Sequence, residues 1–234
     1  MILTVEHHQF KLMVYQMSIY RDNLLQGEAK IGVWGAGFIG FSTLAHFAQE
    51  GVTGVAYDVD SGQVGKVDDG IPPEFGISDW LDFDTEDLAT QGLINATDDY
   101  QNLLTSETIV HFIAVPTEKD GEPYNEALED VISNICEIDV ESYQPPPLII
   151  IESTLTPGTT EKVVLRIFES FDFEIGEDIL LGVAPRRDWF VDDTKSLKNL
   201  DRVFGGVEIR SGKAMDEVLG IVCNVLHSAS SHEE

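Results

Sequence analysis

The sequence predicts an α/β fold in which helices cover both faces of a parallel, doubly wound sheet. Short runs of apolar and β-branched residues alternate with longer stretches at helical spacing along most of the 234 residues. Several of these runs, such as IVHFIAV and LIIIE, are apolar at nearly every position, as in strands buried between two layers of helices. The alternation favours right-handed βαβ units that build one sheet.

The expected elements follow one another with enough chain between strands for a helix. We expect strands at Lys30–Trp34, Gly54–Tyr57, Leu93–Ala96, Thr108–Val115, Leu148–Glu152, Ile179–Ala184 and Val203–Gly206. We expect helices at Phe38–Glu50, Ser61–Asp68, Thr85–Gln91, Asn125–Ile138, Thr159–Ser170 and Ser211–Leu226. Residues 1–28 fit no part of this pattern and are interpreted as a docked amphipathic arm or an upstream extension. Residues 29–210 are expected to form the domain.

The charge is strongly negative, with 42 Asp and Glu against 14 Lys and Arg and a net charge of -28. Such a surface repels phosphates, which argues against nucleic acid as a partner. The acidic residues are spread along the chain, and self-repulsion between them is screened at high ionic strength. We therefore hypothesise a halophilic source with an acidic proteome.

Targeting and metal signals are weak. No apolar run reaches the roughly 18 residues of a membrane span, so we expect no membrane partner. Glu6, His7 and His8 interrupt the place where a signal peptide would be apolar. Cys136 and Cys223 fit a reducing compartment, and the histidines lack ligand spacing, so we expect a cytoplasmic protein without a metal site.

A glycine pattern lies between the first strand and the first helix. Gly35-x-Gly37-x-x-Gly40 combines a tight turn, a close approach of the backbone to a pyrophosphate and close helix–strand packing. The N-terminus of the helix offers free N–H groups and the positive end of its dipole to the phosphates. Phe38 and Ile39, inside the pattern, are expected to contact the cofactor.

The glycine pattern alone is a weak signal, and an aspartate after the second strand supports its interpretation as a dinucleotide-binding loop. Asp58 comes 18 residues after Gly40, where a carboxylate accepts hydrogen bonds from the adenine ribose hydroxyls and repels a 2′-phosphate. The alternative is a cluster of turn glycines beside a surface aspartate. We favour a Rossmann-type domain that binds NAD rather than NADP.

Three later segments place polar residues at the carboxyl ends of strands, where doubly wound sheets bind ligands. The fourth strand leads into Val115-Pro116-Thr117 and an acidic helix. The fifth leads into ESTLTPGTTE, which holds Ser153 and Thr154. The sixth gives LLGVAPRRDWF, in which APRR stands at the carboxyl end of the strand.

Together these segments resemble the UDP-glucose/GDP-mannose dehydrogenase family over about residues 30–234. Other Rossmann dehydrogenases, such as the 6-phosphogluconate type, share the glycine loop but not the Ser-Thr-x-x-Pro-Gly-Thr block. The resemblance implies a two-step, NAD-dependent oxidation of a nucleotide sugar C6 alcohol to a carboxylate, a reaction of polysaccharide biosynthesis. It also implies that full-length members are homodimers.

By the same resemblance, the cofactor contacts extend beyond the glycine loop. The expected NAD contacts are Gly35, Gly37, Phe38, Ile39, Gly40, Asp58, Val115, Pro116, Thr117, Ser153 and Thr154. Thr117 and Ser153 lie on the nicotinamide side, and Thr154 positions a water or the substrate oxygen as the expected catalytic residue. The alternative for Thr117 and Ser153 is that they only cap strand ends.

Two departures from the family bear on activity. The family segment Ser-Pro-Glu-Arg is APRR here, which puts Arg186 where a catalytic glutamate stands. A guanidinium stays protonated and cannot act as a general base; Arg186 either binds a phosphate or carboxylate, or is a surface arginine paired with an acid. The family's nucleophilic cysteine lies beyond a segment that would follow NVLHSASSHEE, so Cys223, inside the last predicted helix, comes too early to match it.

We therefore expect residues 211–234 to begin a helix that connects to a missing middle domain. On this interpretation the chain is a truncated form, shortened for expression or in its gene, which binds NAD with little or no turnover. A non-catalytic nucleotide-binding or regulatory module, and a different small-molecule dehydrogenase that shares only the Rossmann half, stay open. UDP-glucose, UDP-N-acetylmannosamine and GDP-mannose are all compatible sugars.

Overall fold

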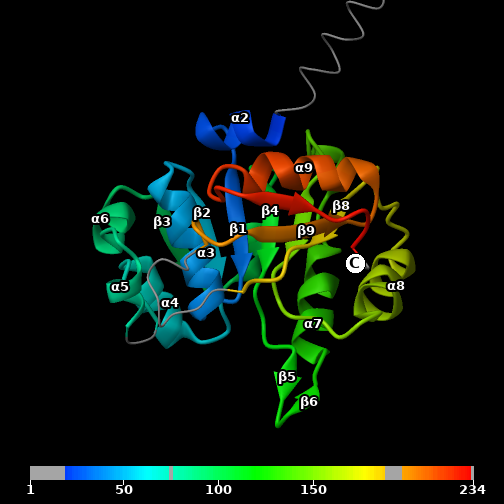
Figure 1. Ribbon diagram of the computed structural model, residues 1–234, viewed down its shortest axis with the longest axis horizontal. Coiled ribbons are helices and arrows are strands. Elements are labelled where there is room, and N and C mark those ends of the chain that lie inside the picture. The colour runs from blue at the N-terminus through cyan, green and yellow to red at the C-terminus, as the bar shows by residue number, and fades with distance from the viewer. Residues whose placement is uncertain (1–18, 74–75, 188–196, 233–234) are drawn as a thin grey trace, which may run out of the picture.

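The computed structural model describes residues 19–73, 76–187 and 197–232, and its centre is an eight-stranded sheet (Figure 1). The strand order across the sheet is β3-β2-β1-β4-β7-β8-β9-β10. The first six of these follow the order of a dinucleotide-binding sheet, with the switch point between β1 and β4. The bounds are β1 (Lys30–Trp34), β2 (Gly54–Tyr57), β3 (Ile94–Thr97), β4 (Thr108–Ile113), β7 (Leu148–Ile151), β8 (Leu180–Val183), β9 (Arg202–Gly206) and β10 (Leu226–Ser228).

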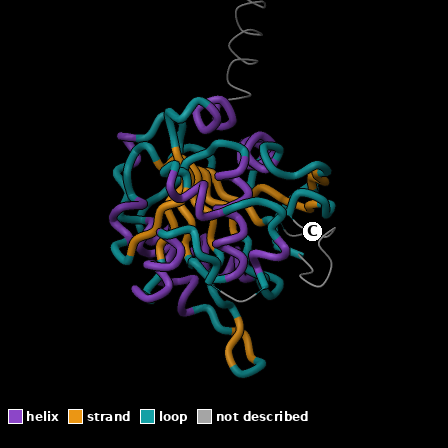
Figure 2. The backbone as a smooth tube through the Cα atoms, turned by 90° about the vertical axis from the view of Figure 1, so that its left-hand side faces the viewer, coloured by secondary structure: helices purple, strands orange, loops and turns teal. Residues whose placement is uncertain are grey.

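Helices cover both faces of the sheet, as the sequence predicts, and the strands run through the middle of the molecule (Figure 2). One apolar cluster joins one face of the sheet to α2, α3, α4, α6 and α9, and a second joins the other face to α7 and α8. The helices are α2 (Ile19–Leu25), α3 (Phe38–Gln49), α4 (Ser61–Asp68), α5 (Ile77–Trp80), α6 (Thr85–Thr90), α7 (Glu126–Ile135), α8 (Leu165–Ser170) and α9 (Ile209–Leu219).

The sheet is parallel from β3 to β8, as predicted, and an antiparallel pairing is added at its far edge. β9 pairs with β8 in the antiparallel direction, and β10 runs parallel to β9. A parallel neighbour needs a crossover, usually a helix. Residues 184–187 and 197–201, the described parts of the β8–β9 connection, form no helix.

The C-terminal part departs from the predicted helix Ser211–Leu226. Helix α9 ends at Leu219, and the chain turns and returns as β10 at the edge of the sheet (Figure 1). The predicted helix Thr159–Ser170 also differs, because its first turn, Thr160–Val164, is wound as a π-helix before α8 begins. A connecting helix to a further domain stays a prediction.

The N-terminal arm is docked in its described part. Helix α2 buries Tyr20 and Leu24, and the Tyr20 hydroxyl donates to the Pro146 carbonyl at 2.5 Å. Arg21 Nη1 donates to the Gly220 carbonyl at 2.9 Å, which ties α2 to the end of α9. The prediction for residues 1–18 lies outside the described residues.

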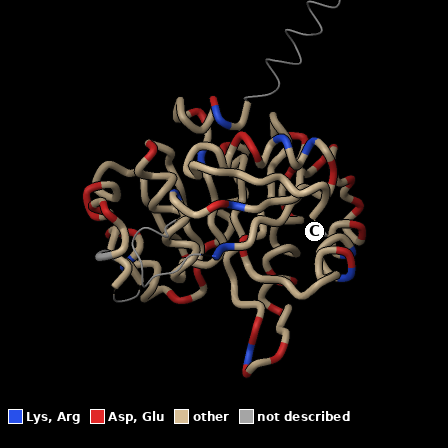
Figure 3. Tube along the Cα trace, viewed as in Figure 1, with Lys and Arg blue, Asp and Glu red and all other residues tan. Residues whose placement is uncertain are grey.

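A small hairpin that the sequence did not predict projects from the carboxyl edge of the sheet (Figures 1 and 2). It pairs β5 (Glu118–Lys119) with β6 (Glu122–Pro123). Asp120 and Gly121 have φ values of 56° and 82°, the left-handed pair that a tight hairpin turn requires. Acidic positions are spread over the part of the chain that the structure describes, including this hairpin (Figure 3). Within the described ranges, none of the helices combines the length and apolar character needed to cross a lipid bilayer.

Candidate cofactor site

A cavity of about 810 Å³ opens at the carboxyl ends of β1, β2 and β4. The glycine loop and the first turn of α3 line one part of it, and α7 lines another. The residues that line it are Gly35, Gly37, Phe38, Ile39, Tyr57, Asp58, Val59, Ala114, Val115, Pro116, Ala127, Asp130, Val131, Ser133 and Asn134. This is the switch point of the sheet, where such folds bind their ligands.

At each of the three loop positions, the structure gives a distinct geometric reason for glycine rather than a larger residue. Gly35 has φ +94°, and a Cβ there would lie 2.6 Å from the Ala114 carbonyl oxygen. A Cβ at Gly40 would lie 1.8 Å from the Gly35 carbonyl oxygen, so the helix could not approach the strand. Gly37 is the reverse case, because within the described ranges no atom outside its two chain neighbours lies within 4 Å of its added Cβ. The open side of Gly37 therefore faces the cavity, where a pyrophosphate would approach the backbone.

Asp58 is held at the mouth of the cavity by backbone N–H groups. Its Oδ2 accepts from Ala36 N at 2.8 Å, and its Oδ1 accepts from Asp60 N at 3.0 Å. A carboxylate has about four acceptor positions, so Asp58 keeps capacity for two ribose hydroxyls. The loop and this aspartate fit an NAD adenosine and pyrophosphate.

The wall formed by α7 was missed by the sequence analysis. Ala127, Asp130, Val131 and Asn134 stand at helical spacing i, i+3, i+4 and i+7, and all four line the cavity. The sequence does carry a signal for this wall, because the helix after β4 of a doubly wound sheet lies beside the switch point.

Of the predicted residues at the later strand ends, Val115 and Pro116 line the cavity. Thr117, Ser153 and Thr154 lie next to this strand end but are not among the lining residues. The Thr117 hydroxyl donates to the Thr154 carbonyl at 2.6 Å, and the Ser153 hydroxyl donates to the Val115 carbonyl at 2.8 Å. These bonds tie the end of β4 to the end of β7. The Thr154 side chain is exposed beside this junction. Gly40 lies behind the loop, against Gly35.

Arg186 is buried, so the reading as a surface arginine is wrong. Its Nη1 donates to Thr43 Oγ1 at 2.5 Å, its Nη2 donates to Ser42 Oγ at 2.9 Å, and Nη1 lies 3.8 Å from Glu152 Oε2. Glu152 also accepts from Thr43 Oγ1 at 2.5 Å and from Arg202 Nη2 at 2.6 Å. The guanidinium thus joins α3 to the ends of β7 and β8, and Arg186 is not part of the cavity lining.

Neither described cysteine lines the cavity. Cys136 ends α7, and burial raises the pKa of its thiol to about 12, which keeps it protonated at neutral pH. Cys223 is buried in the turn between α9 and β10 rather than inside a helix, which corrects the prediction. Among the described residues, no group of three or more His, Cys, Asp and Glu is arranged to hold a metal ion.

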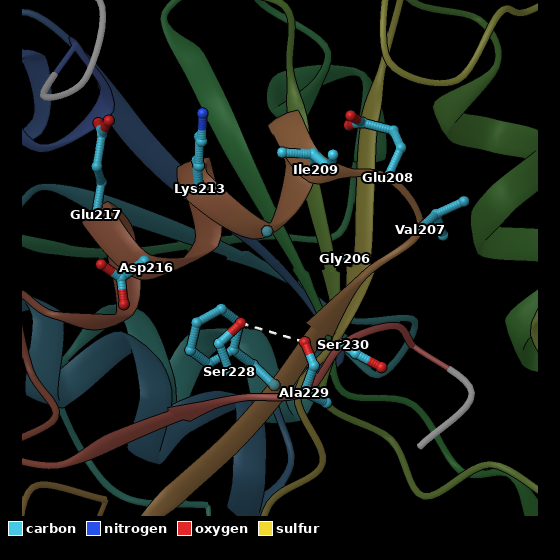
Figure 4. A pocket seen from close by; sticks show the side chains of 12 residues that line it. Gly206, Val207, Glu208, Ile209, Lys213, Asp216, Glu217, Ser228, Ala229 and Ser230 are labelled. Carbon is cyan, nitrogen blue, oxygen red and sulfur yellow. Dashed lines mark hydrogen bonds between the residues drawn. The ribbon is translucent and has the colours of Figure 1, made fainter. Parts of the chain in front are cut away.

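A second cavity, of about 600 Å³, lies between β9, α9 and the residues that follow β10 (Figure 4). It shares no lining residue with the cavity at the glycine loop. Lys213 and Glu217 extend from α9 away from Ser228 and Ala229 (Figure 4). Its walls belong to the antiparallel edge of the sheet, so it is not part of the switch-point site.

The sheet order, the glycine loop at a helix N-terminus and the fixed aspartate define a Rossmann-type dinucleotide-binding domain. The model of the NAD-binding domain of the UDP-glucose/GDP-mannose dehydrogenase family matches residues 29–221. The chain belongs to this family, a family of NAD-dependent oxidoreductases, and NAD is the cofactor of the domain.

Several characterised proteins are similar to this chain. UDP-N-acetyl-D-mannosamine dehydrogenase of Pyrococcus horikoshii is 28% identical over 193 residues, which cover 81% of this chain and 44% of the relative. GDP-mannose 6-dehydrogenase of Pseudomonas syringae is 22% identical over 221 residues, or 85% of this chain and 50% of the relative. The chain spans about half the length of the curated relatives it matches.

Solved structures show the same fold. The structure of UDP-D-ManNAc dehydrogenase from Pyrococcus horikoshii superposes with a TM-score of 0.76 at 26% identity, covering 87% of this chain and 47% of that one. NDP-N-acetyl-D-galactosaminuronic acid dehydrogenase from Methanosarcina mazei gives a TM-score of 0.75 at 26% identity, covering 91% and 47%.

Proposed function

We propose that this chain is the NAD-binding part of a nucleotide-sugar 6-dehydrogenase, which oxidises the C6 alcohol of a UDP- or GDP-linked sugar to the uronic acid. The observation that carries the proposal is the cavity at the switch point, with Gly37 open to it and Asp58 fixed at its mouth. When bound, NAD supplies a hydride acceptor, and the protein supplies its position and environment. The relatives are named for different nucleotide sugars, so the proposal is for the class.

The residues have separate tasks in this proposal. Asp58 accepts from the ribose hydroxyls, and the N–H groups at the start of α3 bind the pyrophosphate. The exposed hydroxyl of Thr154, at the end of β7, positions the substrate oxygen or a water. Thr117 and Ser153 hold that strand end in place through their bonds to the carbonyls of Thr154 and Val115.

We further propose that the chain by itself binds NAD without completing the oxidation. In the family route, a thiolate forms a covalent adduct with the aldehyde, and both described cysteines lie away from the cavity. Arg186, at the position of the family glutamate, is engaged with Glu152 and with two hydroxyls of α3. These observations also favour the second candidate function, a nucleotide-binding module without catalysis.

Calorimetric titration of the purified chain with NAD tests the cofactor site, with the Asp58→Ala variant in parallel. We expect saturable binding that weakens about tenfold in the variant, because two charge-assisted hydrogen bonds are lost. Equal binding by the two proteins would contradict the assigned site.

Absorbance of NADH in the presence of UDP- and GDP-sugars tests turnover. We expect no sustained signal from the chain alone. Steady turnover would contradict the proposal that this chain does not complete the reaction, and its loss in Thr154→Ala would then support the assigned role of Thr154.

A further inference from the structure

The adenosine end of the cavity contains an acidic side chain that Asp58 does not account for. Asp130, on α7, lines the same cavity as Asp58 and Val59 at the end of β2. Its carboxylate makes no hydrogen bond or ion pair with any described residue, whereas both oxygens of Asp58 accept backbone N–H bonds. Asp130 is therefore a carboxylate with its full acceptor capacity facing the place of the cofactor.

The surroundings of Asp130 match the shape and chemistry of a purine base. Val59, after β2, and Ala127 and Val131, on α7, line the same cavity and give it apolar surface against which a flat ring can pack. Val59 is 85% exposed, so its side chain is accessible to a ligand in the cavity. The edge of the ring is then the part that requires polar partners.

The polar groups on α7 follow a pattern that distinguishes bases. Asn134 stands one turn after Asp130 and also lines the cavity, so a carboxylate acceptor and an amide donor lie next to each other on one helix face. Adenine presents a 6-amino donor beside a ring nitrogen acceptor, which is the complement of this pair. Ser133 is already engaged, since its hydroxyl donates to the Glu129 carbonyl at 2.7 Å.

We propose that Asp130 accepts a hydrogen bond from the 6-amino group of the NAD adenine and so selects the base, a role separate from the contact of Asp58 with the ribose. The proposal rests on the assignment of this cavity to NAD. Hypoxanthine carries a carbonyl oxygen in place of the amino group. A carboxylate repels that oxygen, so selection against the hypoxanthine form is the expected signature of Asp130.

The test compares the affinities of NAD and nicotinamide hypoxanthine dinucleotide by calorimetry, for the parent chain and for Asp130→Asn. Asparagine can turn its amide N–H toward a carbonyl, so it tolerates either base. We expect the parent to favour NAD by about tenfold and the variant by about twofold or less, because removing a charged partner from a hydrogen bond costs most of its selectivity.

The matched control is Glu129→Gln. It removes the same charge from the neighbouring position of α7, and Glu129 does not line the cavity. We expect its preference for NAD to equal that of the parent. A preference in Asp130→Asn equal to that of the parent, or a parent that binds both dinucleotides equally, would overturn the role of Asp130. A parent chain that binds neither dinucleotide would instead contradict the cofactor site itself.

Discussion

The guanidinium of Arg186 and the carboxylate of Glu152 form an ion pair of 3.8 Å inside the protein, with side chains that are 2% and 1% exposed. Arg202 reaches the other oxygen of Glu152 at 2.6 Å. Charges in such a place are tolerated only when they are paired and hydrogen-bonded. Arg186 is therefore a structural residue that joins the end of β8 to α3 and to the end of β7.

Breaking this pair is expected to destabilise the domain strongly. The variant Glu152→Gln leaves two buried guanidinium groups without their common counter-charge, and we expect it to lower the free energy of unfolding by about 3–5 kcal/mol. Urea unfolding followed by circular dichroism measures the change. Lys198→Met is the control, because its pair with Glu50 is largely exposed and such pairs contribute about 0–1 kcal/mol. Similar midpoints for the two variants would contradict the structural role of the cluster.

Two glycines of the same loop should respond differently to alanine. In Gly40→Ala the new methyl would lie 1.8 Å from a backbone oxygen, and we expect a loss of about 2 kcal/mol or more in unfolding free energy. In Gly37→Ala the methyl has no close neighbour among the described residues beyond the adjoining ones, so we expect near-parental stability and an NAD affinity reduced at least about tenfold. Thermal unfolding and calorimetry separate the two effects. Parental NAD affinity in Gly37→Ala would contradict the phosphate approach at this loop.

The parts of the fold that the sequence predicted are those with strong local signals. The predicted bounds of β1, β2 and α4 agree with the structure, because apolar runs and turn residues delimit these elements. The end of α9 was wrong, since Ile221 and Val222 continue the apolar pattern of a helix. In the structure they are buried in the turn that leads to β10.

The site residues also fall into those with a local sequence signal and those brought together only by the fold. The glycine loop and Asp58 were predicted as cofactor contacts from local spacing. The pairing of Thr43 with Glu152 joins residues 109 positions apart, and the α7 wall reaches the cavity only through the order of the strands. Nothing in the local sequence around Glu152 or Asp130 distinguishes them from the many acidic residues at the surface.

His111 gives the domain a defined response to acid. Its ring is fully buried, Trp34 Nε1 donates to its Nδ1 at 3.2 Å, and burial lowers the pKa of His111 from 6.5 to about 4. The unfolded chain binds this proton more readily than the folded one between these two values. The stability contribution is thus complete above about pH 6.5 and is lost as the pH falls toward 4.

The variant His111→Gln cannot take up that proton and should respond less to acid. Between about pH 7 and pH 5 we expect the parent to lose roughly 2 kcal/mol more than the variant, at about 1.4 kcal/mol per pH unit below the unfolded pKa. Urea unfolding at the two pH values measures this difference. Any loss of unfolding free energy that the substitution causes equally at the two pH values cancels. Parallel losses in the two proteins would contradict a neutral His111 in the fold.

Salt should stabilise the domain because its net charge is -28. The Debye length falls from about 10 Å at 0.1 M to about 3 Å at 1 M, so repulsion between surface carboxylates is largely removed at high salt. We expect retention of the fold in molar KCl and loss of structure in dilute buffer, measured by thermal unfolding. Sucrose is the uncharged control. Equal stability in molar KCl and in dilute buffer would contradict the hypothesis of adaptation to salt.

The negative charge of the protein should also make NAD binding stronger at high salt. At most phosphate-binding sites, salt weakens binding instead. The residues described as lining the cavity include Asp58 and Asp130 but no Lys or Arg. The main attraction on the pyrophosphate therefore comes from the positive dipole end at the N-terminus of α3. The net negative charge of the protein repels the pyrophosphate. We expect NAD affinity, measured by calorimetry on folded protein, to rise at least about threefold between 0.3 M and 2 M KCl as this repulsion is screened. Asp130→Asn, which removes one of the two carboxylates, should show a smaller rise. An affinity that falls with salt would indicate that a cationic group reaches the phosphates in the bound state.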